Sequence, residues 1–382
     1  MKGLHGILFA YSEPRLKELT EHRTASSLPF GGRYRVIDFM LSSLVNAGVT
    51  DVGVIVRENY QSLLDHLESG RNWDLSRKRG GLRFLPPFGY TKSIGDDHRE
   101  GVPRAKLDPA AYRGILDALY GISDYISHIR QDHVILADGD IIANLPLEEI
   151  FENHLETGAD LTCVCTPLRY DRDERAYFKL GKNGIVNEVL LNRPGKNSVA
   201  DLGVYIMSKN RLQNILSHCD QYGYYHFARD VLRNMYQRIR VAGYLYDGFA
   251  TRIQSVEDYF KQSMLLLNPE VRNDLFSKER PIKTKVRDEP SSYYGQGSKV
   301  RNCVLADGCF LEGDVKNCVI FRGVRVESEA VVRDCILMQD THVRQGARIN
   351  HIITDKEVII NPRTSMSGHK SYPVAIAKGS IV

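Results

Sequence analysis

The sequence predicts an α/β domain followed by a β-solenoid, and two patterns along its 382 residues support this prediction. Up to about residue 265, short apolar runs alternate with stretches of helical periodicity, which is typical of βαβ units and a mainly parallel sheet. After about residue 295 the helical periodicity ends, and a short block recurs at intervals of 15 to 17 residues. We therefore expect two domains, 1–267 and 295–382, joined by a linker over 268–294.

The first domain has a regular order of elements. Strands are expected at residues 6–10, 51–56, 133–137, 160–166 and 201–207. Helices are expected at residues 60–67, 110–130, 147–155, 209–217, 226–238 and 256–267. Ser255 is placed to cap the last of these helices. Because ligands bind beyond the carboxyl ends of parallel strands, we expect the functional residues just after the strands.

The second domain shows self-similar blocks rather than helices. The linker before it is polar, contains prolines and has no periodicity. The blocks begin at Asn302, Asn317, Asp334 and Asn350. Stacked coils place one small residue of each block in an inward slot, and we expect this slot to hold Cys303, Cys318, Cys335 and His351. Stacking sets these side chains in a line rather than a tetrahedron, so a structural role is favoured over zinc binding.

Composition excludes several classes of protein. The chain is 42% hydrophobic, which is enough for a sizeable core, and its formal charge is only +4. No nucleic-acid partner is expected, since such proteins carry larger and clustered positive charge. No apolar run approaches the ~20 residues of a membrane helix, and the run at residues 7–10 is too short for a signal peptide. Seven cysteines without a CxxC pair predict neither zinc nor disulfides, and hence a cytoplasmic location.

Residues 29–39 read PFGGRYRVIDF, which resembles the PFGGxYRxIDF signature of ADP-glucose pyrophosphorylases (glucose-1-phosphate adenylyltransferases). Further resemblances follow in the family's order at residues 70–75, 112–118, 136–140, 202–205 and 281–284. The resemblance implies a Rossmann-like nucleotidyltransferase domain, a C-terminal left-handed parallel β-helix and assembly as a tetramer. The implied reaction joins ATP and glucose 1-phosphate into ADP-glucose and pyrophosphate. It depends on a glycine-rich phosphate loop, a carboxylate-bound Mg²⁺ and a lysine for the sugar phosphate.

The phosphate loop departs from the family pattern GGxGxRL. It reads Tyr11, Ser12, Glu13, Pro14, Arg15, and no glycine remains. Glycines would allow positive φ and close approach of the backbone to phosphate. Pro14 has no N–H to donate, and Glu13 would put a negative charge beside the triphosphate. We therefore expect a degenerate loop in which only the cation of Arg15 persists.

The metal ligands are also incomplete. By resemblance, Asp140 matches the first Mg²⁺ ligand, with Asp138 an alternative carboxylate. The second ligand falls on Arg252, which cannot bind Mg²⁺ and repels it as a permanent cation. We expect the Arg252 side chain to occupy the metal position and to pair with Asp140. No cofactor is then expected on this chain, and Mg²⁺ would act only in a catalytic partner subunit.

Some substrate-binding positions persist by resemblance, and we regard them as vestigial. They are Arg15, Gly114, Asp117, Arg193, Asp201 and Gly203. Arg193 replaces the lysine that binds the sugar phosphate, and a solvated surface role explains it equally well. Bulky residues at 115–116 replace small ones in the nucleotide pocket. Ala25 replaces a lysine of the family's sugar-phosphate activator site, which weakens that site.

The chain keeps the family's scaffold but lacks its phosphate-loop glycines and one of its metal ligands. In this combination it resembles the non-catalytic GlgD-type subunits of the family. We expect a regulatory subunit that joins a catalytic GlgC-type subunit in a heterotetramer, and the sequence leaves open whether a homo-oligomer also forms. Two alternatives remain: an active nucleotidyltransferase with an altered phosphate loop, and an effector-binding subunit that responds to a sugar phosphate or a nucleotide. Turnover by the isolated chain would indicate an active nucleotidyltransferase. A ligand-induced rise in melting temperature would indicate an effector-binding subunit.

Overall fold

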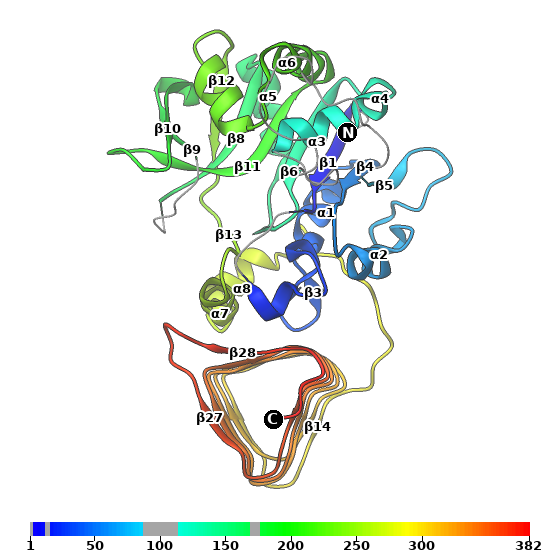
Figure 1. Ribbon diagram of the computed structural model, residues 1–382, viewed down its shortest axis with the longest axis vertical. Coiled ribbons are helices and arrows are strands. Elements are labelled where there is room, and N and C mark those ends of the chain that lie inside the picture. Colours follow the sequence, from blue (N-terminus) through cyan, green and yellow to red (C-terminus); the bar gives the residue numbers. More distant parts are fainter. Residues whose placement is uncertain (1–2, 12–15, 87–113, 169–175) are drawn as a thin grey trace, which may run out of the picture.

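An α/β domain and a triangular β-helix make up the protein (Figure 1). A computed structural model describes residues 3–11, 16–86, 114–168 and 176–382. Within them, the sheet of the first domain has nine strands in the order β10-β9-β11-β6-β1-β4-β5, with β8 beside β11 and β12 beside β8. These strands are β1 Leu4–Phe9, β4 Asp51–Ile55, β5 Gly81–Leu85, β6 His133–Asp138, β8 Leu161–Thr166, β9 Ala176–Leu180, β10 Val186–Leu191, β11 Val199–Ser208 and β12 Val241–Leu245.

The central strands β6, β1, β4 and β5 are parallel, whereas β11 runs antiparallel to β6. Side chains of β1 alternate between two buried apolar clusters, since Leu4 and Leu8 enter one and Ile7 and Phe9 enter the other. The sheet is therefore buried on both faces, as a parallel sheet requires. Two short pairs lie outside it: β2 Pro29–Phe30 with β3 Tyr34–Arg35, and β7 Ile141–Ala143 with β13 Ala250–Arg252.

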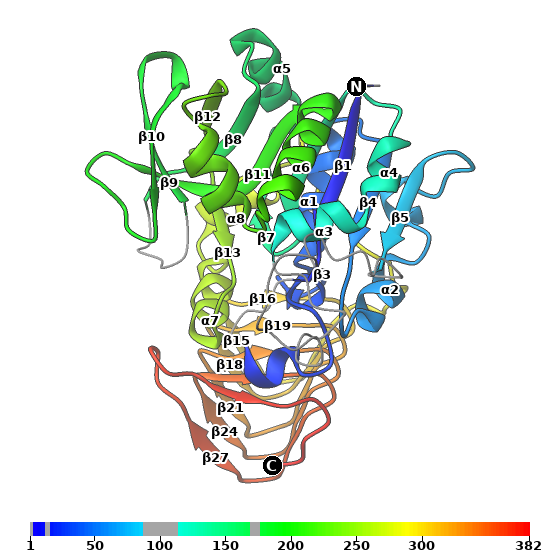
Figure 2. The ribbon, with the colours of Figure 1, turned by 45° about the horizontal axis from the view of Figure 1, so that its top comes forward.

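Helices cover both faces (Figure 2). One face is packed by α1 Ile37–Asn46, α2 Gln61–Leu67 and α5 Leu147–Thr157. The other is packed by α3 Ile115–Gly121, α4 Ser123–Ser127, α6 Lys209–Tyr222 and a π-helix over Phe227–Arg233. The single helix expected over 110–130 is thus wrong, because it breaks at Ile122 into two short helices. Of that range, residues 110–113 lie outside the described part.

Two helices lead toward the second domain. Helix α7, Val256–Leu265, begins at the predicted cap, where the Ser255 hydroxyl accepts a hydrogen bond from the Asp258 N–H at 3.1 Å. In contrast to the predicted linker, residues 268–294 are not irregular throughout. They contain α8, Pro269–Leu275, which the Asn268 side chain caps and buried Leu275 anchors. A proline-led first turn is favourable in a helix, so the proline that indicated a linker instead begins α8.

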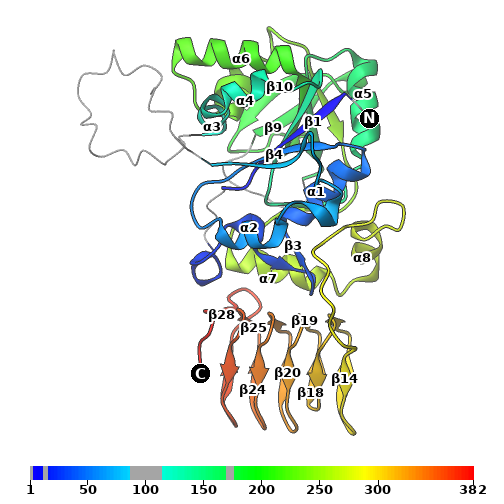
Figure 3. The same ribbon diagram turned by 90° about the vertical axis from the view of Figure 1, so that its right-hand side faces the viewer.

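The coils of the β-helix stack so that their strands form three sheets of parallel strands, and Figure 3 shows the successive coils side by side. The first sheet contains β14 Tyr293–Tyr294, β17 Phe310–Leu311, β20 Arg325–Val326, β23 His342–Val343 and β26 Ile359–Ile360. The second contains β15 Lys299–Arg301, β18 Asp314–Lys316, β21 Val331–Arg333, β24 Arg348–Asn350 and β27 Ser365–Ser367. The third contains β16 Val304–Leu305, β19 Val319–Ile320, β22 Ile336–Leu337, β25 Ile352–Thr354 and β28 Val374–Ile376. The third sheet faces the α/β domain, because Val319, Ile336 and Ile353 join an apolar cluster with Phe30 and Tyr259.

The inward ladder differs from the prediction at one position. Cys318 and Cys335 are fully buried, and Cys303 of the first coil is half-buried. The register Ile336↔Ile353 aligns His351 with Asp334, so Ile352 fills the slot after Cys335 and our placement of His351 there is wrong. His351 instead takes a left-handed corner at φ 52°, like Asp334 at φ 48°. Such corners favour Asn and Asp, and this corner chemistry is what the repeat block shares.

All seven cysteines are free thiols. Among the described residues, no helix is both long enough and apolar enough to span a membrane.

Candidate functional site

The antiparallel pair β7–β13 assembles the first candidate site. Strand β6 ends at Asp138, and Asp140 follows in the turn that leads into β7. The register of β13 on β7 sets Arg252 opposite Ile141, the residue after Asp140. The site therefore lies just beyond the carboxyl end of a central strand, where the sequence places functional residues.

Arg252 bridges the two carboxylates at this position. Its Nη1 lies 2.6 Å from Asp138 Oδ2, and its Nη2 lies 2.8 Å from Asp140 Oδ1. The side chains are mostly buried, with exposed fractions of 17% for Arg252, 14% for Asp138 and 4% for Asp140. Burial alone would lower the pKa of Arg252, but the two carboxylates outweigh it and raise the pKa above its ordinary value. The guanidinium is therefore permanently charged here.

This arrangement does not fit a magnesium ion. Mg²⁺ needs carboxylate and water oxygens around a free position, and here a guanidinium bonds the oxygens of both Asp138 and Asp140. In the part of the chain that the structure describes, no group of three or more His, Cys, Asp or Glu side chains is placed to hold a metal. The expected pairing of Arg252 with Asp140 is present, and Asp138 joins it.

Gly203 and Asp201 complete the cluster from β11. Gly203 has φ +85°, and a Cβ there would lie 2.4 Å from Asp138 Oδ2 and 3.1 Å from Arg252 Nη1. Only glycine therefore permits the Arg252 pair at this distance. The buried Asp201 carboxylate accepts hydrogen bonds from the Gly203 N–H and the Tyr205 hydroxyl. Both bonds lie within β11, so the Asp201 carboxylate stabilises the irregular part of this strand, where its register with β8 shifts.

The remaining predicted positions are more dispersed. Gly114 precedes α3, where a Cβ would lie 2.2 Å from the Tyr225 carbonyl oxygen, so this glycine serves close packing. Asp117 is half-buried in the first turn of α3. Arg193 is exposed after β10 and has no ion pair with a described residue. Of the degenerate loop, Tyr11 packs edge-on against Phe9 at 6.1 Å between ring centroids. Ser12, Glu13, Pro14 and Arg15 lie outside the described residues.

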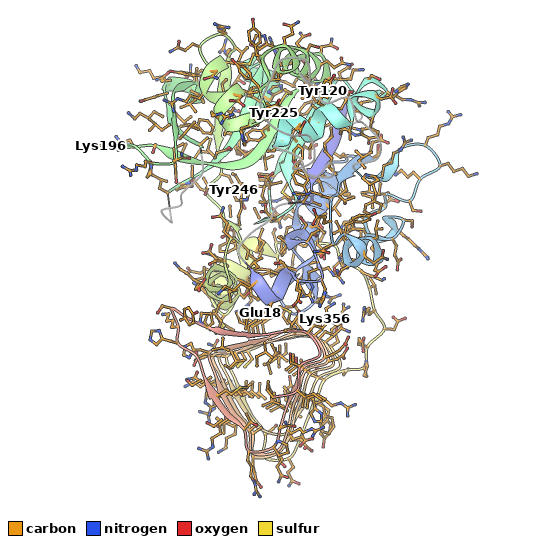
Figure 4. All side chains as sticks on the ribbon, in the orientation of Figure 1. Glu18, Tyr120, Lys196, Tyr225, Tyr246 and Lys356 are labelled. Carbon is orange, nitrogen blue, oxygen red and sulfur yellow. The ribbon has the colours of Figure 1, made fainter. Side chains whose placement is uncertain are left out.

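A second candidate site is a cationic cavity of about 420 Å³ between the two domains. Sequence analysis missed it, because its basic residues come from separate segments: Arg23, Arg33, Arg35, Lys285, Arg287, Arg322, Lys356 and Lys378. Among the described residues that line it, Asp65 is the only carboxylate. Figure 4 shows Lys356 at the junction of the domains. The sequence signal is the PFGGRYRVIDF segment, which supplies both Arg33 and Arg35 to the lining.

The cations of this interdomain cavity are only partly compensated. Arg35 donates to the Ser62 carbonyl and hydroxyl, both at 2.7 Å, and burial lowers the pKa of Arg35 to about 10. Burial, together with Arg35 and Arg23, lowers the pKa of Lys356 to about 7. Arg322 is 7% exposed, and its Nε and Nη2 find no hydrogen-bond partner among the described residues. Buried, unpaired donors of this kind favour an anionic ligand.

A buried ion pair closes one side of this cavity. Arg23 Nη2 lies 2.7 Å from Asp355 Oδ2 and 2.9 Å from Oδ1, with side chains only 5% and 2% exposed. Arg23 precedes the short 3-10 helix Ala25–Ser27, and Asp355 belongs to the β-helix. The segment with Ala25, where we expected a weakened activator site, thus anchors one domain to the other.

Comparison with known proteins agrees with this architecture. Residues 7–265 match the nucleotidyl transferase family, and residues 288–371 match the GlmU-like C-terminal hexapeptide repeat. The chain is 31% identical over 366 residues to "Glycogen biosynthesis protein GlgD" of Bacillus subtilis (strain 168), which covers 96% of this chain and 93% of that protein. The GlgD protein of Geobacillus stearothermophilus is 32% identical over 366 residues, which again cover 96% of this chain and 93% of that protein. A "Glucose-1-phosphate adenylyltransferase" of Bacillus thuringiensis (strain Al Hakam) is 27% identical over 96% of this chain and 95% of its own.

The chain belongs to the glucose-1-phosphate adenylyltransferase family and is similar to its GlgD members. The family resemblance read from the sequence is confirmed. The fold class is confirmed as well: a nucleotidyltransferase domain with a mainly parallel sheet, followed by a left-handed β-helix of hexapeptide type. In this member of the family, Arg252 holds the position between Asp138 and Asp140.

Proposed function

We propose that this chain is a regulatory subunit of a glucose-1-phosphate adenylyltransferase in glycogen biosynthesis, with little or no turnover of its own. The observation that carries the proposal is the Arg252 guanidinium bonded between Asp138 and Asp140. Two relatives named as glycogen biosynthesis protein GlgD support the pathway. Magnesium chemistry then belongs to a catalytic GlgC-type subunit in a mixed tetramer. The regulatory subunit acts by favouring the active conformation of that neighbour across their interface.

The test is a coupled pyrophosphate-release assay with ATP, glucose 1-phosphate and Mg²⁺. Three preparations are compared at equal protein concentration: this chain, the catalytic subunit, and the two co-expressed. We expect no signal from this chain above the background without enzyme, and a higher kcat or lower KM for the mixture than for the catalytic subunit. Magnesium-dependent turnover of ~1 s⁻¹ or more by this chain alone would support the alternative of an active enzyme and overturn the proposal.

A second, compatible function is effector binding in the interdomain cavity. Its basis is the buried guanidinium of Arg322, whose Nε and Nη2 lack partners among the described residues, together with a described lining of eight arginines and lysines against one carboxylate. We propose that a sugar phosphate or a nucleotide binds there.

Fructose 1,6-bisphosphate and AMP serve as probes in a thermal melt, since a ligand of the native state raises the melting temperature with concentration. The rise should vanish in Arg322→Gln and persist in the matched control Lys299→Gln, on an exposed part of the β-helix. Equal shifts in both variants would exclude this cavity.

A further inference from the structure

A second basic cavity, of about 400 Å³, lies at the opposite edge of the central sheet. It is lined by His5 near the start of β1, Asp51 at the start of β4 and Gly81 at the start of β5. In Figure 2 the start of β1, marked N, lies far from β13. This amino-end cavity shares no described lining residue with the interdomain cavity or with the Arg252 cluster. The proposal below is independent of the regulatory function proposed above.

The floor of the amino-end cavity is made of neutral hydrogen-bonding groups. His5 is 4% exposed, and its Nε2 lies 3.0 Å from the Tyr125 hydroxyl. The His5 Nδ1 is buried, and the Gln131 side chain, which also lines the cavity, acts on His5 through a hydrogen bond. Burial lowers the pKa of His5 to about 4, so the imidazole is uncharged at neutral pH. The floor therefore offers uncharged hydrogen-bonding groups, the His5 imidazole, the Tyr125 phenol and the Gln131 amide.

Asp51 shapes the cavity rather than neutralising its rim. Its carboxylate accepts hydrogen bonds from the Gly81 N–H at 3.1 Å and from the Gln131 side-chain amide at 2.5 Å. Gly80 has φ +80°, and a Cβ there would lie 1.6 Å from Asp51 Oδ1. The loop therefore requires glycine to close onto the carboxylate. The hydrogen bond from the Gly81 N–H to Asp51 thereby holds the preceding basic residues, Lys78 and Arg79, beside the cavity.

The rim of the amino-end cavity carries four cations. They are Lys78, Arg79, Arg83 and Arg130. None of them forms an ion pair with a described carboxylate, whereas the neighbouring Arg77 pairs with Asp74 at 2.6 Å. The charge of Arg83 reaches the floor, since it adds to the burial that lowers the pKa of His5 and opposes the burial that raises the pKa of Tyr125. Four cations that share one cavity with the single carboxylate of Asp51 repel one another, and an anion in the cavity relieves this repulsion.

We propose that the amino-end cavity binds a sugar phosphate, with the phosphate on the rim arginines and sugar hydroxyls on the His5–Tyr125 floor. Guanidinium groups bind phosphate through paired, charge-assisted hydrogen bonds. A neutral imidazole nitrogen and a phenol exchange hydrogen bonds with hydroxyls and have no preference for a second anion. The volume lies within the range of small-molecule sites.

Calorimetric titration of the full chain with glucose 6-phosphate tests the proposal. The titration is run in an Arg322→Gln background, which disables the interdomain cavity, and we expect saturable binding there that weakens at least tenfold on adding the double variant Arg79→Gln/Arg83→Gln. Arg79 and Arg83 are exposed, so the double variant should retain the wild-type melting temperature without ligand. Loss of all binding in Arg322→Gln alone overturns the proposal. The absence of binding at ~10 mM probe, where even a site of millimolar Kd is mostly filled, also overturns it.

Three further arms examine the ligand class. Inorganic phosphate should bind more weakly than glucose 6-phosphate, and His5→Phe, which keeps a ring on the floor, should remove most of that difference. Equal affinity of the two probes for the wild type would indicate a simple anion-attracting surface and overturn the sugar assignment. Tighter binding of citrate than of glucose 6-phosphate would overturn the phosphate assignment. In ¹⁵N-histidine-labelled protein, saturation with glucose 6-phosphate should shift the His5 Nδ1 resonance, identified by its absence in His5→Phe.

Discussion

The guanidinium of Arg252 lies 2.8 Å from the carboxylate of Asp140, a residue 112 positions earlier in the chain. The same guanidinium reaches Asp138 at 2.6 Å. Two short antiparallel strands, β7 and β13, bring these groups together at the end of β6. A cation supplied by the protein thus stands beside the carboxylates that, by family resemblance, would hold a metal. A change at Arg252 should therefore also affect the stability of the domain.

Replacing Arg252 by glutamine should lower the free energy of unfolding by about 3 kcal/mol, because it leaves two largely buried carboxylates without a counter-charge. Urea denaturation followed by tryptophan fluorescence measures this change, since buried Trp73 lies in the same domain. The matched control is Arg77→Gln, which breaks an exposed pair with Asp74 and should cost less than about 1 kcal/mol. Equal costs for the two variants would contradict the importance of burial.

Replacing Arg252 by aspartate should create a three-carboxylate site with Asp138 and Asp140. We expect millimolar Mg²⁺ to raise the melting temperature of Arg252→Asp and to leave the wild type unchanged, because only the variant gains a native-state metal ligand. Ca²⁺ and Na⁺ at matched ionic strength control for general salt effects. If Mg²⁺ stabilises the wild type equally, the inference that Arg252 excludes the metal is wrong.

Gly203→Ala should destabilise the protein by about 3 kcal/mol. The new methyl group must adopt φ near +85° and would lie 2.4 Å from Asp138 Oδ2, so strain and steric overlap add. Gly158→Ala is the control, because its φ of +56° imposes similar backbone strain while a Cβ added there would have no neighbouring atom within 4 Å. We expect about 1 kcal/mol for the control by denaturant titration. A loss of unfolding free energy in Gly203→Ala no greater than in the control would show that the Asp138–Arg252 pair can shift to accommodate the methyl group without loss of stability.

The stability of the α/β domain should fall as pH drops from about 6.5 to about 4. Burial lowers the pKa of both His5 and His154 to about 4, whereas the unfolded chain titrates near 6.5. Between these values the unfolded state binds more protons, so acid favours unfolding by roughly 3 kcal/mol per histidine. Denaturation midpoints across this pH range test it. His154→Gln should flatten the profile, and replacement of the exposed His128 should not. A profile that is identical for both variants would refute the assignment.

The Arg23–Asp355 pair should couple the two domains. Arg23→Met leaves Asp355 buried and uncompensated, which should cost about 3–5 kcal/mol. The double variant Arg23→Met/Asp355→Asn should cost at least about 1 kcal/mol less than the sum of the single variants, because the pair interacts directly. Calorimetry should also separate the melting of the two domains in Arg23→Met. Additive costs and a single transition would show that the apolar cluster around Phe30 alone joins the domains.

Local patterns along the chain predict much of the fold. The strands observed as β1, β4 and β6 lie within two residues of their predicted bounds, since burial on both faces leaves short apolar runs. Patterns failed where tertiary contacts competed with them. The helix expected over 110–130 breaks at Ile122 because both halves bury apolar residues against α6, and α8 forms in a proline-bearing segment because Leu275 is buried. In the β-helix, His351 aligns with Asp334 because both residues take the left-handed corner conformation, and His351 therefore does not occupy the inward slot.

The sequence by itself determined that the loop after the first strand has no glycine and that the C-terminal quarter repeats, and its family resemblance set Arg252 at the position of a metal ligand. These conclusions rest on the type and order of residues along the chain, which need no knowledge of the chain path. Only the tertiary structure decided that Asp138 shares the guanidinium, that Arg23 pairs with Asp355, and that cations from separate segments meet in two cavities. The physical reason is that periodicity reports which face of an element is buried, whereas the encounter of distant charges depends on how the elements pack.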